Sequence, residues 1–277
     1  MNNALQKFSF TLSPPAPRFA RLRHSFRWWA PLLTVACVLA LWQAATVFAW
    51  LPAFILPSPS EVFDKWTAVI ESGMLQRHTL VTLQEMTLGL MWGVAIGSVL
   101  GYLIAHNRYL EAALSPLIVA FQATPVVAYA PLLIIWFGNG MTSKVVTCAI
   151  IVFFPTLINT IIGIRSVPAG WHDVFRSMQA TRWQRLLLLE LPAALPVFLA
   201  GLKTSATLAL IGAVVGEFVS AREGLGYMVT LARNQFDTPL VFVGVFTMTA
   251  LALSFYSAVS VMERVLLRWQ RVRNQSK

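Results

Sequence analysis

Residues 112–143 read AALSPLIVAFQATPVVAYAPLLIIWFGNGMTS, a run of 32 residues without a charged side chain. About 20 apolar residues are enough for a helix to cross the hydrocarbon core of a bilayer, so this run is longer than one straight span requires. It contains Pro116, Pro125 and Pro131, and proline removes a helical hydrogen-bond donor and kinks the segment. We therefore expect a bent or interrupted membrane span that lines something polar.

Other apolar runs recur along the chain. Those without any charge cover residues 28–50, 86–105, 145–164 and 238–262, and residues 191–216 are interrupted only by Lys203. Hydrophobic residues make up 57% of the chain and charged residues only 12%, which excludes a soluble globular protein. The sequence predicts an all-α, polytopic transmembrane helical bundle of about six spans.

The positive charge is distributed unevenly between the two sides of the predicted membrane. With a cytoplasmic N-terminus, 15 of the 21 Lys and Arg residues lie in cytoplasmic segments, five lie outside, and Lys203 lies within a span. Such an excess in cytoplasmic segments is the positive-inside pattern. It orients the chain with its N-terminus in the cytoplasm, and it accounts for the net charge of +10 without a nucleic-acid partner.

The chain then divides into three parts. Residues 1–27 form a cytoplasmic tail, residues 28–264 form the membrane domain with a cytoplasmic loop at 165–191, and residues 265–277 form a basic cytoplasmic tail. The apolar run that opens the membrane domain exceeds the roughly 7 to 15 residues of a signal-peptide core, so we expect a retained helix.

Glycine repeats along the second predicted span. Gly89, Gly93, Gly97 and Gly101 are each four residues apart, so they line one face of a helix. Small residues at this spacing let two membrane helices approach closely, and the spacing predicts a tight helix contact there.

The cytoplasmic loop begins with an amphipathic pattern. Trp171, Val174, Phe175 and Met178 follow the spacing of one helical face, which predicts a short helix. Thr181, with Gln184 three positions later, is a capping box that predicts a second helix starting at Arg182 and running toward Pro192.

This loop admits two interpretations. Its arginines suit contacts with lipid phosphates, which would make it a membrane-surface element. Its apolar aromatic face rimmed by arginines also has the composition of a protein interface. The residue pattern leaves both open.

Residues 173–196, DVFRSMQATRWQRLLLLELPAALP, resemble the EAA loop of bacterial ABC importer permeases, with the pattern E-A-A, three residues, Gly, nine residues, I-x-L-P. Asp173, Val174 and Phe175 stand at the EAA positions; Leu189, Leu191 and Pro192 stand at the I-x-L-P positions. Residues 75–265 resemble the nitrate, sulfonate and taurine type of permease and its thiamine-precursor and riboflavin relatives. The matching pieces are PLLIIWFGNGMTSKVV, FFPTLINTIIGIRSV, GAVVGEFVSAREGLGYM and FDTPLVF.

The resemblance implies the type I ABC importer transmembrane domain in a bacterial inner membrane, surrounded by lipid. It further implies a homodimer of permease chains, cytoplasmic ATP-binding subunits and an extracytoplasmic substrate-binding protein. The implied solute is a small organic molecule such as a thiamine precursor, riboflavin, a sulfonate or taurine. Because the chain has no G-x-x-x-x-G-K-[ST] loop, we expect the partner subunit to use ATP, and we expect neither a cofactor nor a catalytic residue in this chain.

The same resemblance assigns the loop to ATPase coupling, with movement passed on through an elbow at Pro192. The candidate coupling residues are Trp171, Asp173, Phe175, Met178, Gln179, Ala180, Thr181, Arg182 and Pro192. Gln179 departs from the family glycine, and glutamine does not take a positive φ cheaply. Either the corner between the two helices is reshaped or the ATPase groove differs.

The candidate pathway residues are Gln122, Thr124, Asn159, Lys203 and Glu217. Gln122 and Thr124 line a pathway or pack between helices. Lys203 is the only charge within a predicted span, and snorkelling or pairing between helices is favoured over solute contact. Glu217 lies near the outer end of its helix, where it meets the binding protein, gates the mouth or is an ordinary interfacial carboxylate.

The alternative function is an ion-gradient-driven secondary transporter. That class is expected to show inverted repeats and intramembrane carboxylates, and neither is evident in the sequence. The four histidines lie in separate segments without ligand spacing, so we expect no metal site.

Overall fold

A computed structural model describes residues 19–52 and 54–268, and within these ranges the chain forms helices and no strand. It divides into two compact units, Met1–Pro59 and Ser60–Lys277. The first unit contains α1 (Phe19–Val47), where the indole Nε1 of Trp42 donates a hydrogen bond to the carbonyl oxygen of Pro57 at 2.9 Å. Most of the two predicted cytoplasmic tails lies outside the described residues.

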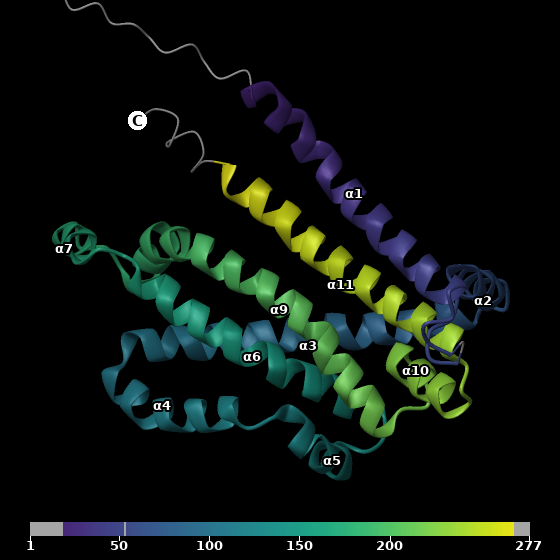
Figure 1. Ribbon diagram of the computed structural model, residues 1–277. Coiled ribbons are helices and arrows are strands. Elements are labelled where there is room, and N and C mark those ends of the chain that lie inside the picture. The colour runs from purple at the N-terminus through teal and green to yellow at the C-terminus, as the bar shows by residue number, and fades with distance from the viewer. Residues whose placement is uncertain (1–18, 53, 269–277) are drawn as a thin grey trace, which may run out of the picture. The chain divides into compact units, whose positions relative to one another are not determined.

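Three helices pack side by side in the second unit: α3 (Met74–His106), α6 (Met141–Arg165) and α9 (Leu191–Ser220) (Figure 1). Around them lie α2 (Pro59–Glu71), which precedes α3, and α10 (Leu225–Asn234) and α11 (Thr238–Leu266), which pack on α9 and on each other. The centre of this core is formed by Met86, Cys148, Val152, Ala209 and Ala213, all fully buried. These side chains are small or flexible, which suits helices that run close together.

Four helices of the described chain are long and apolar enough to cross a membrane. They are α3, α6, the continuous helix from Arg182 to Ser220, and α11, and a bent pair of shorter helices forms a fifth candidate. In the first unit, the apolar part of α1 covers Leu32–Val47. The predicted all-α, polytopic bundle is confirmed, and about six spans is consistent with these segments.

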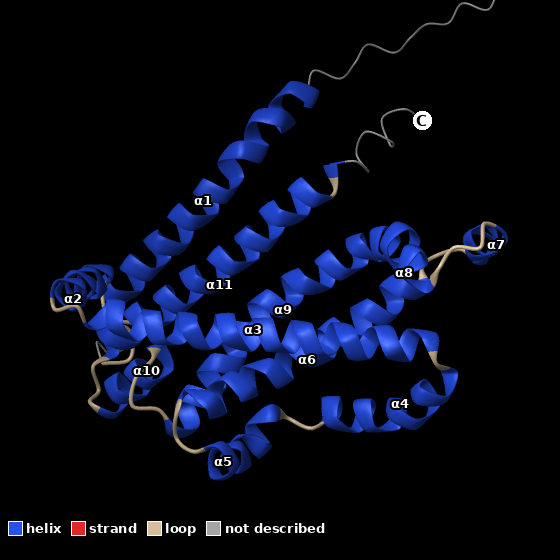
Figure 2. Ribbon diagram, turned by 180° about the vertical axis from the view of Figure 1, so that it is seen from behind, coloured by secondary structure: helices blue, strands red, loops and turns tan. Residues whose placement is uncertain are grey.

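The long apolar run at residues 112–143 is interrupted, as predicted. It forms α4 (Arg108–Ala123) and α5 (Val126–Phe137), which bend by 99° at the break between them (Figure 2). Thr124 has extended backbone there, and it precedes Pro125, whose ring disfavours helical backbone in the preceding residue. Pro116 and Pro131 both lie inside helices, so Pro125 is the proline that breaks the span.

The glycine ridge on α3 faces α6. A Cβ atom added to Gly93 would lie 2.6 Å from the carbonyl oxygen of Ala149. A Cβ atom added to Gly97 would lie 2.9 Å from the carbonyl oxygen of Phe153. A Cβ atom added to Gly101 would lie 2.8 Å from the carbonyl oxygen of Leu157. Side chains would therefore collide with the backbone of α6 turn after turn. The close helix contact predicted from the spacing is confirmed.

The spanning helices extend beyond the charge-free runs. α3 begins at Met74 and α6 at Met141, so these helices contain Glu85 and Lys144, which are 1% and 6% exposed. The prediction that Lys203 is the only charge within a span is therefore wrong. The predicted spans were bounded by charged residues, so they stopped short of Glu85 and Lys144. A helix in a bundle can continue past such a residue when its side chain finds partners on neighbouring helices.

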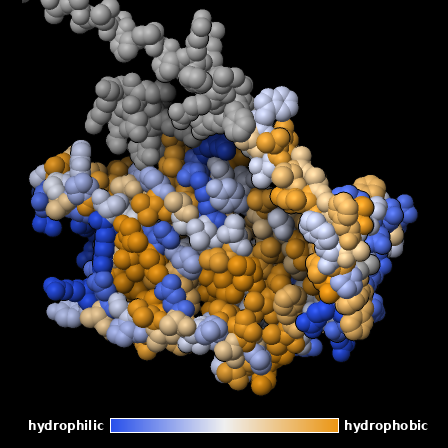
Figure 3. Space-filling model, viewed as in Figure 1, coloured by the Kyte–Doolittle hydropathy of each residue, from blue (hydrophilic) through white to orange (hydrophobic). Residues whose placement is uncertain are grey.

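Large hydrophobic side chains cover wide areas of the face shown in Figure 3. On α3 the exposed series Trp92, Ile96, Val99 and Leu103 repeats with helical spacing. Monomeric soluble proteins rarely leave apolar areas this large in water. The exposed series on α3 is therefore a surface for lipid or for another membrane helix.

Candidate functional site

The first helix of the loop predicted to be cytoplasmic, α7 (Ala169–Ser177), lies away from the packed helices (Figures 1 and 2). It has no buried residue and makes no extensive contact with another described helix. Trp171 is 56% exposed and Met178 72% exposed. Val174 is also exposed, while Phe175 is half-buried. The apolar face predicted from the spacing is thus open.

Gln179 forms the corner after α7. Its φ is 55°, in the left-handed region that glycine occupies most easily. The backbone amide of Gln179 donates a hydrogen bond to the carbonyl oxygen of Arg176 at 3.0 Å. The backbone amide of Ala180 donates to the carbonyl oxygen of Phe175, also at 3.0 Å. These bonds close the end of the helix in the manner of a glycine C-cap. The corner therefore has a backbone that suits the family glycine, with glutamine in its place.

The second helix begins at the predicted capping box. The backbone amide of Gln184 donates a hydrogen bond to the hydroxyl of Thr181 at 3.2 Å. In return, the side-chain Oε1 of Gln184 accepts a hydrogen bond from the backbone amide of Thr181 at 2.8 Å. The helix α8 (Arg182–Arg185) continues through the π-helical turn η1 (Leu186–Glu190) into α9.

The predicted second helix is thus not separate from the following span, because Arg182 to Ser220 form one continuous helix. Pro192 lies in the first turn of α9, directly after the π-turn η1, and the helix does not break there. In η1 the amide of Leu191 donates to the carbonyl of Leu186, five residues earlier. A wider turn of this kind accommodates a proline, which has no amide hydrogen, without ending the helix.

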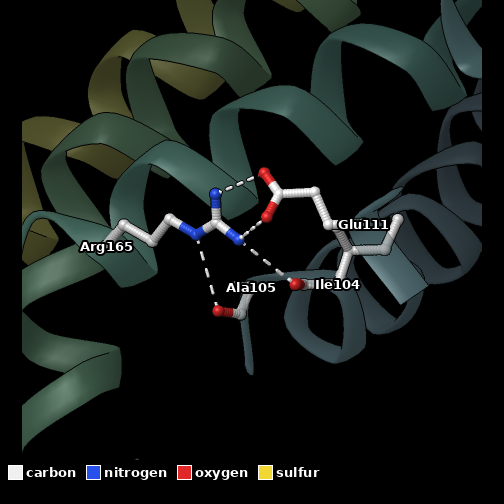
Figure 4. Close-up of polar contacts among 4 residues, drawn as sticks. All are labelled: Ile104, Ala105, Glu111 and Arg165. Carbon is white, nitrogen blue, oxygen red and sulfur yellow. Dashed lines mark hydrogen bonds and ion pairs between the residues drawn. The ribbon is translucent and has the colours of Figure 1, made fainter. Parts of the chain in front are cut away.

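The loop starts at a polar junction between α6, α3 and α4 (Figure 4). Both terminal nitrogens of Arg165 donate to the carboxylate of Glu111, at 2.6 and 2.8 Å. The same guanidinium reaches the carbonyl oxygens of Ile104 and Ala105 at 3.4 and 3.5 Å. Arg165 thus covers the last carbonyls of α3 while it holds the first turn of α4, a two-pronged geometry that arginine favours.

The loop ends at a second contact with the same part of α3. Glu190 is 2% exposed, and its Oε1 lies 3.1 Å from Nε2 of His106, the last residue of α3. The ring of His106 packs on that of Tyr102 with centroids 4.5 Å apart. Both ends of the loop are therefore tied to the C-terminal end of α3.

Residues 93–271 of the chain match the family described as the binding-protein-dependent transport system inner membrane component. The chain belongs to this family. Such proteins are the permease subunits of ABC importers, so this chain is a multi-pass permease of the inner membrane. The recognition made from the loop is confirmed, and the alternative of a gradient-driven secondary transporter is set aside.

Several relatives match almost the whole permease. The riboflavin transport system permease protein RibX of Chloroflexus aurantiacus is 46% identical, over 92% of this chain and 96% of the relative. The formylaminopyrimidine transport permease protein ThiX of Halalkalibacterium halodurans is 34% identical, over 90% of this chain and 99% of the relative. Among solved structures, an inward-facing form of the MetNI methionine ABC transporter has a TM-score of 0.62, covering 70% of this chain and 96% of that one. At 20% identity, that match concerns the fold alone.

The permease does not gather its five candidate pathway residues in one place. Gln122 and Thr124 border a small cavity of about 140 Å³ at the break between α4 and α5, which Pro155 of α6 also lines. Asn159 donates from Nδ2 to the carbonyl of Pro155 at 2.8 Å and lies against Gly201 of α9. Asn159 therefore fills the contact between α6 and α9.

The two charged candidates both have partners inside the bundle. Lys203 of α9 forms an ion pair with Glu263 of α11, and both side chains are about one-fifth exposed. Glu217 is 2% exposed, accepts a hydrogen bond from the Thr82 hydroxyl at 2.6 Å, and accepts another from the amide of Gly226. Lys203 thus pairs between helices, and Glu217 holds the start of α10 against α3.

A cluster of buried ionisable residues was not predicted from the sequence. The carboxyl group of Glu85 contacts that of Glu217 and lies close to Lys144, whose ammonium donates to the carbonyl of Gly140 at 3.2 Å. The signal for it was present, because Glu85 falls on the same helical face as Gly89 and the rest of the ridge. Extending that face upstream of the apolar run would have placed Glu85 inside the bundle.

Proposed function

We propose that this permease works in an ATP-driven importer in which α7 seats on a separate ATP-binding subunit. The observation that carries the proposal is the open apolar face of α7, on a short helix with no buried residue. An exposed apolar face on an otherwise unsupported helix marks a binding surface. Trp171, Phe175 and Met178 form its centre. Asp173, Gln179, Ala180, Thr181 and Arg182 surround it.

The remaining partners follow from the direction of the chain. In the second unit, α7 and α10 lie at opposite ends (Figure 1). With α7 and the N-terminus in the cytoplasm, α10 faces outward, where a substrate-binding protein delivers the solute. Two copies of the permease enclose the pathway. The excess of Lys and Arg in the predicted cytoplasmic segments supports this orientation.

The proposed solute is a small organic molecule, and riboflavin is the first one to test. The relative named as a riboflavin transport permease shares 46% identity over nearly its whole length. Relatives named for formylaminopyrimidine, aliphatic sulfonates and taurine share 34%, 33% and 28%. Formylaminopyrimidine and taurine are therefore the comparison solutes.

In the proposed mechanism, ATP draws the two ATP-binding subunits together, and each carries a seated α7 with it. The capping box at Thr181 and Gln184 keeps the second part of the loop helical. The movement therefore reaches α9 through η1 and Pro192 as the displacement of a continuous helix.

The test is reconstitution of the permease in lipid vesicles with its ATP-binding subunit and its binding protein. Phe175→Asp places a charge in the centre of the apolar face, which costs about 2 to 4 kcal/mol of docking free energy when an interface hot spot is lost. We expect the ATP-binding subunit to dissociate and both ATP hydrolysis and riboflavin uptake to fall. Phe63→Asp, the same change at an exposed position on α2, is the control and should keep the subunit bound.

Wild-type association and uptake by Phe175→Asp would show that α7 faces lipid and would refute the proposed docking. Coupled ATP hydrolysis without uptake of riboflavin, but with uptake of formylaminopyrimidine or taurine, would change the solute and leave the docking intact.

A further inference from the structure

The exposed part of the cytoplasmic loop is tied at both ends to one place, the corner between α3 and α4. We define this corner as residues 102–111. At its start, the loop is tied through Arg165, which grips Glu111 in the first turn of α4. At its end, the loop is tied through Glu190, which contacts His106 at the end of α3. Two contacts separated by the whole loop in sequence thus converge on a single corner.

Between these two ties only Val167, two residues after Arg165, is buried among the described loop residues. α7 has no buried residue and no extensive contact with another described helix, and α8 packs only on η1 to any extent. A displacement of α7 can therefore reach the bundle only through the helices that continue from the loop and through the two ties. The ties are the route that leads to α4.

The arm formed by α4 and α5 depends on that route at its cytoplasmic end. α4 has no buried residue, and among the described helices it packs mainly on α3. Asn107 caps α4 by accepting the amides of Tyr109 and Leu110 at 3.0 and 3.2 Å, which fixes the corner as a compact unit. The Arg165–Glu111 pair then joins this unit to the start of the loop.

The end of the loop has room to move relative to the corner. A cavity of about 420 Å³ separates Leu186 and Leu191 from Tyr102 on α3. Glu190 uses one carboxylate oxygen for His106, while its Oε2 is buried and accepts no hydrogen bond from the described residues. Close-packed interfaces resist displacement, whereas a void beside the few polar contacts of Glu190, with His106 and Tyr102, permits it.

We propose that the α3–α4 corner receives the movement of the coupling loop and passes it to the broken span, with Arg165, Glu111, His106 and Glu190 as positioning residues. The inference rests on the proposed function. It adds a separate claim, that ATP moves the α4–α5 arm through the corner, in addition to moving α9 through the continuous helix.

The perturbation is Glu111→Gln. This substitution removes the negative charge of Glu111 and leaves one acceptor oxygen in place of two. The bidentate interaction with Arg165 is therefore weakened. The side chains of this pair are 41% and 36% exposed, and pairs at such exposure contribute little to stability, so the variant should fold. The matched control is Glu223→Gln, which breaks the exposed Arg77–Glu223 pair. Arg77 lies about 44 Å from His106 along α3, at a rise of 1.5 Å per residue.

The first measurement is the amount of riboflavin transported per ATP hydrolysed in vesicles that hold the complete transporter. We expect Glu111→Gln to lower this ratio about fivefold or more, the lower range of measured coupling between sites. Association with the ATP-binding subunit should not change. Glu223→Gln should keep the wild-type ratio.

The second measurement needs no solute. A spin label at Tyr109→Cys, an 89% exposed position on α4, reports its mobility with and without ATP in a Cys37→Ser background. We expect ATP to change the mobility in the wild-type background and Glu111→Gln to abolish that change.

The inference is overturned if Glu111→Gln keeps the wild-type ratio and the ATP-dependent signal at position 109. The parallel Phe175→Asp variant separates the two failures. If that variant keeps the ATP-binding subunit bound, the proposed function itself fails. If it releases the subunit while Glu111→Gln behaves as wild type, only the role of the corner fails.

Discussion

The close packing of the glycine ridge against α6 predicts that one added methyl group on α3 lowers the stability of the permease. A Cβ at Gly93 would lie 2.6 Å from the Ala149 carbonyl oxygen and 2.8 Å from both Cβ and Cγ1 of Val152. Ordinary van der Waals contacts begin near 3.4 Å, so α3 and α6 must separate by about 0.6 to 0.8 Å to admit Gly93→Ala. Overpacking of this kind costs about 1 to 3 kcal/mol of unfolding free energy.

The matched control is Gly140→Ala. Gly140 has a negative φ, and no heavy atom would lie within 4 Å of its added Cβ. Both variants add the same methyl group and restrict the unfolded chain alike, so their difference reports the α3–α6 contact.

The assay is thermal unfolding of the purified permease in detergent. At about 2 to 4 °C per kcal/mol for a chain of this size, Gly93→Ala should melt roughly 2 to 12 °C below Gly140→Ala. Equal melting temperatures for the two variants would mean that the helices do not approach as closely as the ridge implies.

Two further predictions concern the loop and the charged residues. Gln179→Gly removes the steric strain of a side chain at a left-handed φ, so we expect it to stabilise the corner after α7 by about 1 kcal/mol. Hydrogen exchange of the Ala180 amide should then slow about fivefold, and an unchanged exchange rate would contradict this prediction. Lys203→Met leaves the carboxylate of Glu263 unpaired and should lower the unfolding free energy by about 1 to 3 kcal/mol. The double variant Lys203→Met with Glu263→Gln removes that unpaired charge, so it should recover both stability and solute uptake. A double variant that is stable yet inactive in solute uptake would mean that Lys203 contacts the solute.

The features that the sequence predicted well are those set by neighbours along the chain. The break at Pro125 follows from the chemistry of one residue, and the capping box at Thr181 needs only the side chain three positions later. The apolar face of α7 is a matter of helical spacing. Local patterns of this kind act within one or two turns, so a single segment contains the information.

The features that it missed arise from contacts between distant segments. The face of the glycine ridge indicates that Glu85 lies inside the bundle, but Glu85 and Lys144 are 59 residues apart, and neither segment shows that they meet beside Glu217. The pairing of Arg165 with Glu111 likewise depends on where two helices end in space. The π-turn before Pro192 merged a predicted short helix with the next span, because the choice between a break and a wider turn is made by the surrounding packing.

The isolation of α7 from the packed helices has a consequence for how such transporters diversify. Its side chains make no extensive contact with another described helix, so substitutions on it leave the interior of the bundle unchanged. On the proposed docking through α7, a lineage can acquire a different ATP-binding subunit by altering this one helix, while the residues that shape the membrane interior evolve under separate constraints. Under that proposal the choice of ATP-binding subunit and the choice of solute are independently inheritable traits.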